Sequence, residues 1–260
     1  MSIDHQTHSV AGDASSLLLT VPFWFGLILY IWAAVRFSHL HKVWPIYRSV
    51  LWTAGIACAL IAVAGPLAEK AHTDFTAHMA GHLLLGMLAP LLMVVAAPIT
   101  LLLRTIPVRQ ARLLTRLLKS RPTRFLTDPV TASILNVGGL WILYTTSLYT
   151  LMHESQLFHF LIHVHVFLAG YLFTASIMYI DPVSHRRSFL YRTIVLVFTL
   201  AGHGILSKYL YVHPPAGVPA VQAEAGSMLM YYGGDAIDLV LIVVFCFQWY
   251  KAARPRTALA

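Results

Sequence analysis

The sequence predicts an all-α integral membrane protein, built as a single bundle of seven transmembrane helices. Of its 260 residues, 58% are hydrophobic and only 11% are charged, and the mean hydropathy is +0.71. Because this charged fraction is less than half the usual one, a water-soluble fold is excluded. Cys58 and Cys246 lie inside apolar runs, which excludes both a disulfide scaffold and a thiolate metal cluster.

Seven apolar stretches approach or exceed the roughly 20 residues that a bilayer-spanning helix needs. They cover residues 17–36, 47–67, 75–103, 129–150, 156–180, 190–211 and 227–250. Pro90 and Pro98 predict that the third stretch is kinked or ends in a short re-entrant turn. The expected layout is an outer N-terminal tail (1–16), one membrane domain (17–250) and a cytoplasmic tail (251–260).

The distribution of Lys and Arg predicts the orientation of the bundle. Sixteen of the 18 basic residues lie in segments 36–48, 104–128, 181–192 and the C-terminal tail, leaving Lys70 and Lys208 on the opposite side. By the positive-inside rule, the N-terminus is outside and the C-terminus is in the cytoplasm. The chain has no basic region before the first span and no small-residue cleavage site, so no removable signal peptide is expected.

The densest basic segment, 105–127, predicts an amphipathic helix on the cytoplasmic lipid surface. Apolar residues such as Val108, Leu113 and Leu117 alternate with its arginines, a pattern typical of interfacial helices. A docking surface for a cytoplasmic partner is the alternative. The basic residues flank membrane spans, so a nucleic-acid partner is not expected.

The histidines are distributed differently from the arginines. The chain has 14 histidines against ten acidic residues, and eleven of the histidines lie on the predicted outer side. At a rise of 1.5 Å per residue, His82, His163, His203 and Asp235 lie about 10–12 Å below the outer ends of four spans. His78 and His159 lie about 6 Å higher, each on the helix face of its deeper partner.

These positions favour metal or haem ligation. One intramembrane histidine is usually hydrogen-bonded to a neighbouring helix, but two HxxxH pairs level with a further His and Asp are harder to explain as packing. His72, beside Asp74 in the outer loop, is a candidate entry site, and His153 is a weaker one. His165 lies about 200° around the helix from His163 and is expected to face elsewhere. Met79 and the other outer methionines favour Cu(I), because thioethers select that ion.

Three segments carry a family resemblance. Residues 75–104 read FTAHMAGHLLLGMLAPLLMVVAAPITLLLR, residues 159–170 read HFLIHVHVFLAG, and residues 228–239 read MLMYYGGDAIDL. They resemble the CtaG family of multi-span cytochrome c oxidase assembly proteins. Ile162 departs from the pattern, since many relatives have an acidic residue there. The resemblance implies a multi-pass protein of the bacterial inner (plasma) membrane that binds metal through His78, His82, His159 and His163.

The leading hypothesis is therefore a copper-binding assembly factor for a haem–copper oxidase, and not an enzyme. Cu(I) would enter past His72 and Met79, bind the histidine layers and pass to an oxidase subunit as the acceptor. A periplasmic or extracellular copper donor, the lipid bilayer and a second copy of the chain are the other expected partners. One alternative is a haem-binding electron carrier with His82 and His163 as axial ligands. Another is a metal transporter, for which the cytoplasmic half offers few polar groups.

Overall fold

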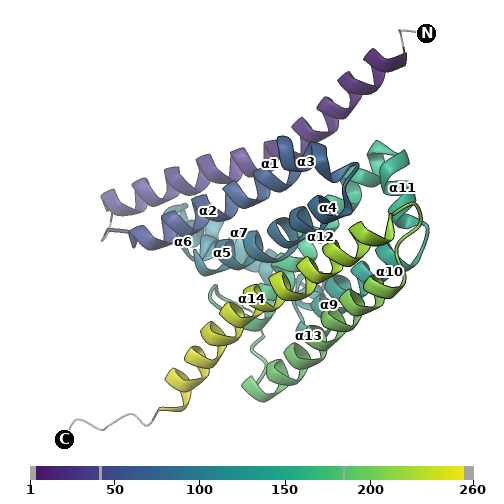
Figure 1. The fold of residues 1–260 in the computed structure, drawn as a ribbon. Helices are drawn as coiled ribbons and strands as arrows, with labels where there is room; N and C mark the ends of the chain where they lie inside the picture. The colour runs from purple at the N-terminus through teal and green to yellow at the C-terminus, as the bar shows by residue number, and fades with distance from the viewer. Residues whose placement is uncertain (1–3, 41–42, 184, 255–260) are drawn as a thin grey trace, which may run out of the picture.

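The computed structural model describes residues 4–40, 43–183 and 185–254, and over these residues it is entirely helical (Figure 1). The first half of the chain forms α1 (Asp4–Leu40), α2 (Ile46–Val63), α3 (Pro66–Ala71), α4 (Phe75–Leu83), the π-helical turn η1 (Leu84–Leu88), α5 (Ala89–Val95), α6 (Pro98–Thr105), α7 (Val108–Leu118) and α8 (Arg121–Leu126). The second half forms α9 (Pro129–Ser133), the π-helical turn η2 (Ile134–Gly138), α10 (Gly139–Thr145), α11 (Leu148–Glu154), α12 (Gln156–Met178), α13 (Phe189–Val212) and α14 (Ala220–Ala253).

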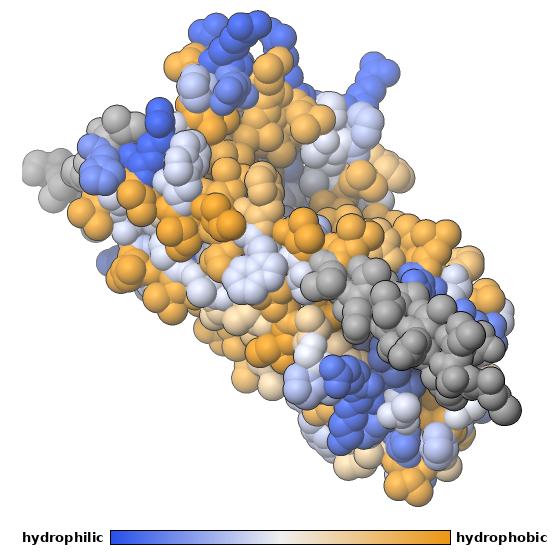
Figure 2. Space-filling model, turned by 90° about the horizontal axis from the view of Figure 1, so that it is seen from above, coloured by the Kyte–Doolittle hydropathy of each residue, from blue (hydrophilic) through white to orange (hydrophobic). Residues whose placement is uncertain are grey.

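Six helices of the described chain are long and apolar enough to cross a membrane. They are Leu18–His39, Ile46–Val63, Phe75–Val95, Gln156–Met178, Phe189–Val212 and Ala220–Ala253. Their outward faces carry large apolar side chains, including Phe25 and Phe198, which are 66% and 74% exposed. Apolar residues cover the middle of the face in Figure 2, and hydrophilic ones gather towards its ends. Such a surface is suited to a bilayer, and the chain is a multi-pass membrane protein.

Two predicted segments differ from single helices. Segment 129–150 is divided into α9, η2 and α10, followed by α11, and the run from Pro129 to Thr145 is shorter than the 18 residues of α2. The predicted count of seven spans therefore stays a prediction. At the other end of the chain, α1 begins at Asp4, so most of the predicted tail 1–16 is helical.

The third predicted stretch is broken where its prolines lie. Pro90 is the second residue of α5, which directly follows η1 and ends at Val95. Ala97 then adopts a left-handed backbone conformation (φ 54°), and Pro98 starts α6. The carboxylate of Asp181 accepts hydrogen bonds from the backbone N–H groups of Ile99 (3.2 Å) and Thr100 (2.7 Å). This interaction satisfies the otherwise unpaired first turn of α6.

Helix α12 crosses η1 at unusually close range. Pro90 has no N–H to donate to the carbonyl of Gly86, four residues earlier, so this carbonyl lacks its usual helical partner. A Cβ added to Gly170 would overlap the Gly86 carbonyl. Glycine at this position of α12 is therefore what allows the two backbones to meet, as in other closely packed membrane helices.

The basic segment between α6 and α9 forms two short helices. In α7 the side chains of Val108, Leu113 and Leu117 are exposed, between arginines that are also mostly exposed. The segment thus has the surface that an interfacial amphipathic helix presents to lipid.

Arg192 joins three helices at their basic ends. Its side chain is 3% exposed, and it donates a hydrogen bond to the carbonyl of Ile177 at the end of α12. Its guanidinium lies 4.3 Å from the ring centres of both Tyr179 and Phe189 and 5.1 Å from that of Phe245 in α14. A planar guanidinium can stack on aromatic rings and donate in its own plane at the same time.

Arg192→Lys is accordingly expected to destabilise the bundle although it preserves the charge. An ammonium group has no planar face with which to stack, so we expect a loss of about 2 kcal/mol. The measurement is the thermal unfolding midpoint of the purified protein in detergent, with Arg109→Lys on the exposed α7 as the matched control. Equal midpoints for the two variants would contradict the packing role of Arg192.

Candidate metal centre

Seven histidines of five segments approach one another in the bundle, and α3 and α11 lie at the same end of it (Figure 1). The segments are the turn after α3 and the helices α4, α11, α12 and α13. In that order they contribute His72, His78 and His82, His153, His159 and His163, and His203.

The start of α4 determines where its two histidines lie. The Asp74 carboxylate caps the helix, accepting hydrogen bonds from the backbone N–H groups of Thr76 (2.8 Å) and Ala77 (3.4 Å). A side-chain acceptor at this position is the common way to satisfy the free N–H groups of a first turn. His78 and His82 follow one helical turn apart, so both project from the same side of α4.

Five of the histidines form an outer cluster. The rings of His72 and His159 are stacked with their centres 5.3 Å apart, and those of His159 and His163 are 4.1 Å apart. The ring of His153 lies 6.4 Å from that of His72 and 6.2 Å from that of His78. The cluster therefore forms a continuous series of imidazoles from α4 through α11 to α12.

Backbone hydrogen bonds define the tautomers of two rings in the outer cluster. Nδ1 of His153 lies 2.9 Å from the Tyr149 carbonyl, and Nδ1 of His163 lies 2.8 Å from the His159 carbonyl. A carbonyl oxygen only accepts, so Nδ1 is the protonated nitrogen in both rings. In the neutral rings Nε2 then keeps its lone pair, the form in which histidine binds a metal.

A hydrogen bond to a tyrosine also holds the outer cluster in place. Nε2 of His78 is hydrogen-bonded to the hydroxyl of Tyr144 at 3.1 Å. Loss of solvent, followed in importance by the charge of His153, lowers the pKa of His72 below its usual value. A lowered pKa keeps the imidazole neutral over more of the physiological range, which favours metal binding over protonation.

His82 and His203 form an inner pair. Their side chains are 7% and 6% exposed, and their ring centres are 6.2 Å apart. Both ring nitrogens of His82 and Nε2 of His203 are buried, and no described residue forms a hydrogen bond with them. A Cβ at Gly234 of α14 would lie 2.6 Å from Cε1 of His203, so this glycine makes room for the ring. Buried nitrogens without partners are rare in proteins, so these atoms are candidates for binding an ion or a water molecule.

Two small cavities adjoin these rings, and His82 lines both. The inner one, of about 30 Å³, lies between His82 and His203, with Asn136 and Asp238 in its wall. The outer one, also about 30 Å³, lies between His82, His78 and His163. Each is large enough for a water molecule or an ion. His82 is thus the residue that connects the outer cluster with the inner pair.

Each cavity also has a methionine in its wall. Met152 lines the outer cavity, and Met87 lines the inner one. Met79, the methionine expected at the site, lines neither: it is fully buried in an apolar cluster with Phe75 and Met230. Successive residues of a helix point about 100° apart. Met79, which directly follows His78, therefore points away from the cavities and into this apolar cluster.

The expected carboxylate, Asp235, does not line the inner cavity. Asp235 is exposed on α14, whereas Asp238 is buried and lines the inner cavity. His165 behaves as expected from its angle on α12: its Nε2 lies 3.1 Å from the Leu135 carbonyl, and its side chain is exposed. Among the described residues, no three His, Cys, Asp or Glu side chains converge to form a ready-made metal site.

Sequence reasoning missed three residues of this region. Asn136 is a lone amide in a predicted span, and a polar residue at that depth is itself a signal of function. Tyr144 is an ordinary aromatic residue in an apolar helix, so nothing in the sequence singles it out. Tyr149, whose ring centre lies 5.4 Å from that of His78, is equally inconspicuous.

The fold and this site together define a multi-pass helical membrane protein with layered histidines near one end of its bundle. The chain belongs to the cytochrome c oxidase caa3 assembly factor (Caa3_CtaG) family, whose model matches residues 28–252. The family resemblance carried by the three sequence segments is thereby confirmed.

Its curated relatives are mycobacterial. Uncharacterized proteins of Mycobacterium bovis and Mycobacterium tuberculosis are each 34% identical over 171 residues, covering 62% of this chain and 26% of their own length. An uncharacterized protein of Mycobacterium leprae is 32% identical over 244 residues, covering 85% of this chain and 37% of its own. The chain thus spans only 26% to 37% of the length of these relatives. No solved structure shows significant similarity.

Proposed function

We propose that this protein binds copper as cargo and supplies it to, or inserts it into, a haem–copper cytochrome c oxidase, without acting as an enzyme. The observation that carries the proposal is the buried His82–His203 pair, whose unpartnered nitrogens lie beside the outer cluster. Membership of an oxidase assembly family supplies the acceptor, a subunit of that oxidase.

The chemistry of the donor set supports copper. Neutral imidazoles and thioethers suit Cu(I), whereas carboxylates and water suit harder ions. In each cavity histidine rings adjoin a methionine: His82 and His203 with Met87, and His78 and His163 with Met152. Two such ligands are enough for Cu(I), so the pairwise arrangement of the rings is compatible with this ion.

The arrangement also suggests a route for the ion. Cu(I) would arrive at His72 and His153, the most exposed rings of the outer cluster, from a donor outside the cell. Through His78, His159 and His163 it would reach His82 and then the inner pair. Each move exchanges one imidazole for another, and delivery to the oxidase is a further ligand exchange. No covalent bond of a substrate is broken along this route.

Metal analysis combined with the visible spectrum tests this proposal. We expect the protein purified from copper-supplemented cells to hold about one or two copper ions per chain and to show no Soret band. Zinc-supplemented cells are the control for non-specific loading. No Soret band is expected because the cavities, at about 30 Å³ each, are far smaller than the roughly 300 Å³ or more of an ordinary cofactor pocket. A stoichiometric haem spectrum would establish the electron-carrier alternative instead.

We further infer seven crossings, with the N-terminus outside and the C-terminus in the cytoplasm. In support, α1 starts at the end of the bundle opposite to the end where α14 stops (Figure 1), which requires an odd number of crossings. The broken run α9–η2–α10 would be the seventh, beside the six long helices. Burial between α12 and α13 would compensate for its interrupted helix.

Reporter fusions test this topology. A fusion after Ala260 should be active only as a cytoplasmic reporter, because most of the basic residues lie at that end. A fusion in the loop between α13 and α14, near Gly217, is the opposite control and should be active only outside. If the Gly217 fusion is active only in the cytoplasm, the proposed entry of copper from outside is wrong.

A further inference from the structure

A second site lies at the basic end of the bundle, away from the histidines. There α8, the start of α9 and the residues before α13 enclose a pocket of about 440 Å³. Its wall includes Arg121, Arg124, Phe125, Asp128 and Arg187. Three arginines and one carboxylate thus share one pocket, and the pocket has a net positive charge.

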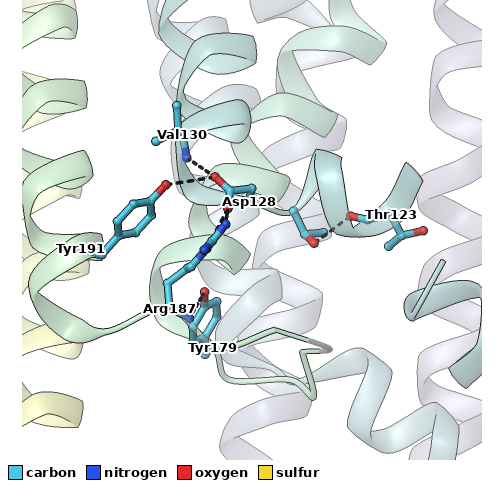
Figure 3. A network of polar contacts seen from close by, with 7 residues as sticks. Thr123, Asp128, Val130, Tyr179, Arg187 and Tyr191 are labelled. Carbon is cyan, nitrogen blue, oxygen red and sulfur yellow. Dashed lines mark hydrogen bonds and ion pairs between the residues drawn. The ribbon is translucent and has the colours of Figure 1, made fainter. Parts of the chain in front are cut away.

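The single carboxylate of the pocket is already occupied (Figure 3). Arg187 donates to Oδ2 of Asp128 from Nε (2.9 Å) and from a terminal nitrogen (2.7 Å). Oδ1 accepts from the Val130 N–H (3.1 Å) and the Tyr191 hydroxyl (3.3 Å). In the described part of the chain, Arg121 and Arg124 form no ion pair. Their two charges therefore remain available for an anion.

An apolar groove of about 500 Å³ lies next to this pocket on the outside of the bundle. Val130, Ile134 and Trp141 form one wall, and Ile194 and Phe198 of α13 form the other. Val130 lies between two residues of the basic pocket, Pro129 and Thr131. From Val130 to Trp141 the groove follows the helix for about 16 Å at 1.5 Å per residue.

Gly138 forms part of the groove floor. A Cβ added there would meet only its own helix neighbour, Cγ2 of Ile134, at 3.7 Å. The space above Gly138 is thus open. Since Phe198 and Ile134 are 74% and 64% exposed, the groove opens on the apolar surface that the bilayer covers.

We infer that this pocket and groove bind one anionic glycerophospholipid. Its phosphate would lie between Arg121 and Arg124, and one acyl chain would lie over Gly138 between α10 and α13. The charge of the pocket complements a phosphate, and arginine is the residue best suited to bind one. Basic pockets between membrane helices are known sites for anionic head groups. A free phosphate ion would leave the adjoining groove without an occupant.

Native mass spectrometry of the delipidated full chain tests this inference, with dioleoylphosphatidylglycerol and dioleoylphosphatidylcholine as probes. We expect the anionic lipid to be retained at least about tenfold better than the zwitterionic one, since each arginine near a head group contributes about 1 kcal/mol. The double variant Arg121→Gln/Arg124→Gln should lose this preference. Arg109→Gln/Arg112→Gln, with the same spacing on the exposed α7, should retain it.

A second variant separates lipid from free phosphate. Gly138→Leu places a side chain in the open groove, so it should weaken binding of the dioleoyl lipid while leaving binding of its short-chain dihexanoyl analogue unchanged. If Gly138→Leu has no effect and inorganic phosphate displaces the lipid completely, the pocket binds an ion and the lipid site is wrong. Equal retention of the two lipids by the wild type would also overturn it.

Discussion

His82→Ala is expected to remove most of the copper from the purified protein. The ring lines both cavities and forms one half of the inner pair, so its loss would remove a candidate ligand from each. A water molecule in apolar surroundings replaces an imidazole poorly. Mutation of a residue that only supports a metal ligand lowers metal affinity roughly 10- to 100-fold. We therefore expect His82→Ala, which removes a candidate ligand itself, to lower the affinity for Cu(I) about 100-fold or more. The measurement is competition for Cu(I) with a chelator of known affinity.

Other histidines provide matched controls for this result. His203→Ala should approach the effect of His82→Ala, since it removes the other half of the inner pair. His78→Ala and His159→Ala should have smaller effects, because four other imidazoles of the outer cluster would still be able to bind the ion. His165→Ala and His185→Ala should be nearly neutral: the first ring bonds to the Leu135 carbonyl, and the second lies at the basic end. If His185→Ala and His82→Ala lose copper equally, the site is not where we place it.

Cellular oxidase activity provides the functional readout for the same variants. If copper supply is the role of the protein, activity should fall in the same order as bound copper, and added copper should partly restore it. A variant that loses copper but assembles a fully active oxidase would separate metal binding from the assembly function.

Gly170→Ala is expected to destabilise the bundle far more than the same added methyl group does at Gly138 or Gly81. The new Cβ would overlap the Gly86 carbonyl, and because this contact is between Cβ and backbone, no rotamer change relieves it. Overpacking usually costs about 1–3 kcal/mol, and a backbone clash belongs at the upper end. The helices would have to separate, which would also move His159 and His163 on α12.

Membrane yield and the unfolding midpoint of the purified protein measure this effect. Gly138→Ala is the matched control, because its Cβ would meet only Ile134 at an ordinary 3.7 Å. Gly81→Ala is a second control, since its nearest neighbour, the Ala62 carbonyl, is also 3.7 Å away. A Gly170→Ala protein as stable as both controls would mean that α12 and η1 do not cross as closely as described.

Hydropathy was sufficient to predict the helices themselves, because a span must satisfy its own backbone hydrogen bonds in lipid. The predicted stretch 156–180 is observed as α12 (Gln156–Met178), and the stretch 190–211 as α13 (Phe189–Val212). The least accurate predictions concern 75–103 and 129–150. These segments contain the π-helical turns η1 and η2. A π-helical turn has no hydropathy signal of its own, so hydropathy could not predict it.

Hydropathy and residue positions were enough to predict a helical membrane protein whose histidines collect near one end. Length, hydropathy and position along a helix are one-dimensional properties, so they can be read directly. Which side chains meet could not be predicted in this way, because it depends on how the helices pack. Met152 rather than Met79 lines the outer cavity, and Asp238 rather than Asp235 lines the inner one. The direction of a side chain depends on how its helix is rotated, and neighbouring helices and π-helical turns set that rotation.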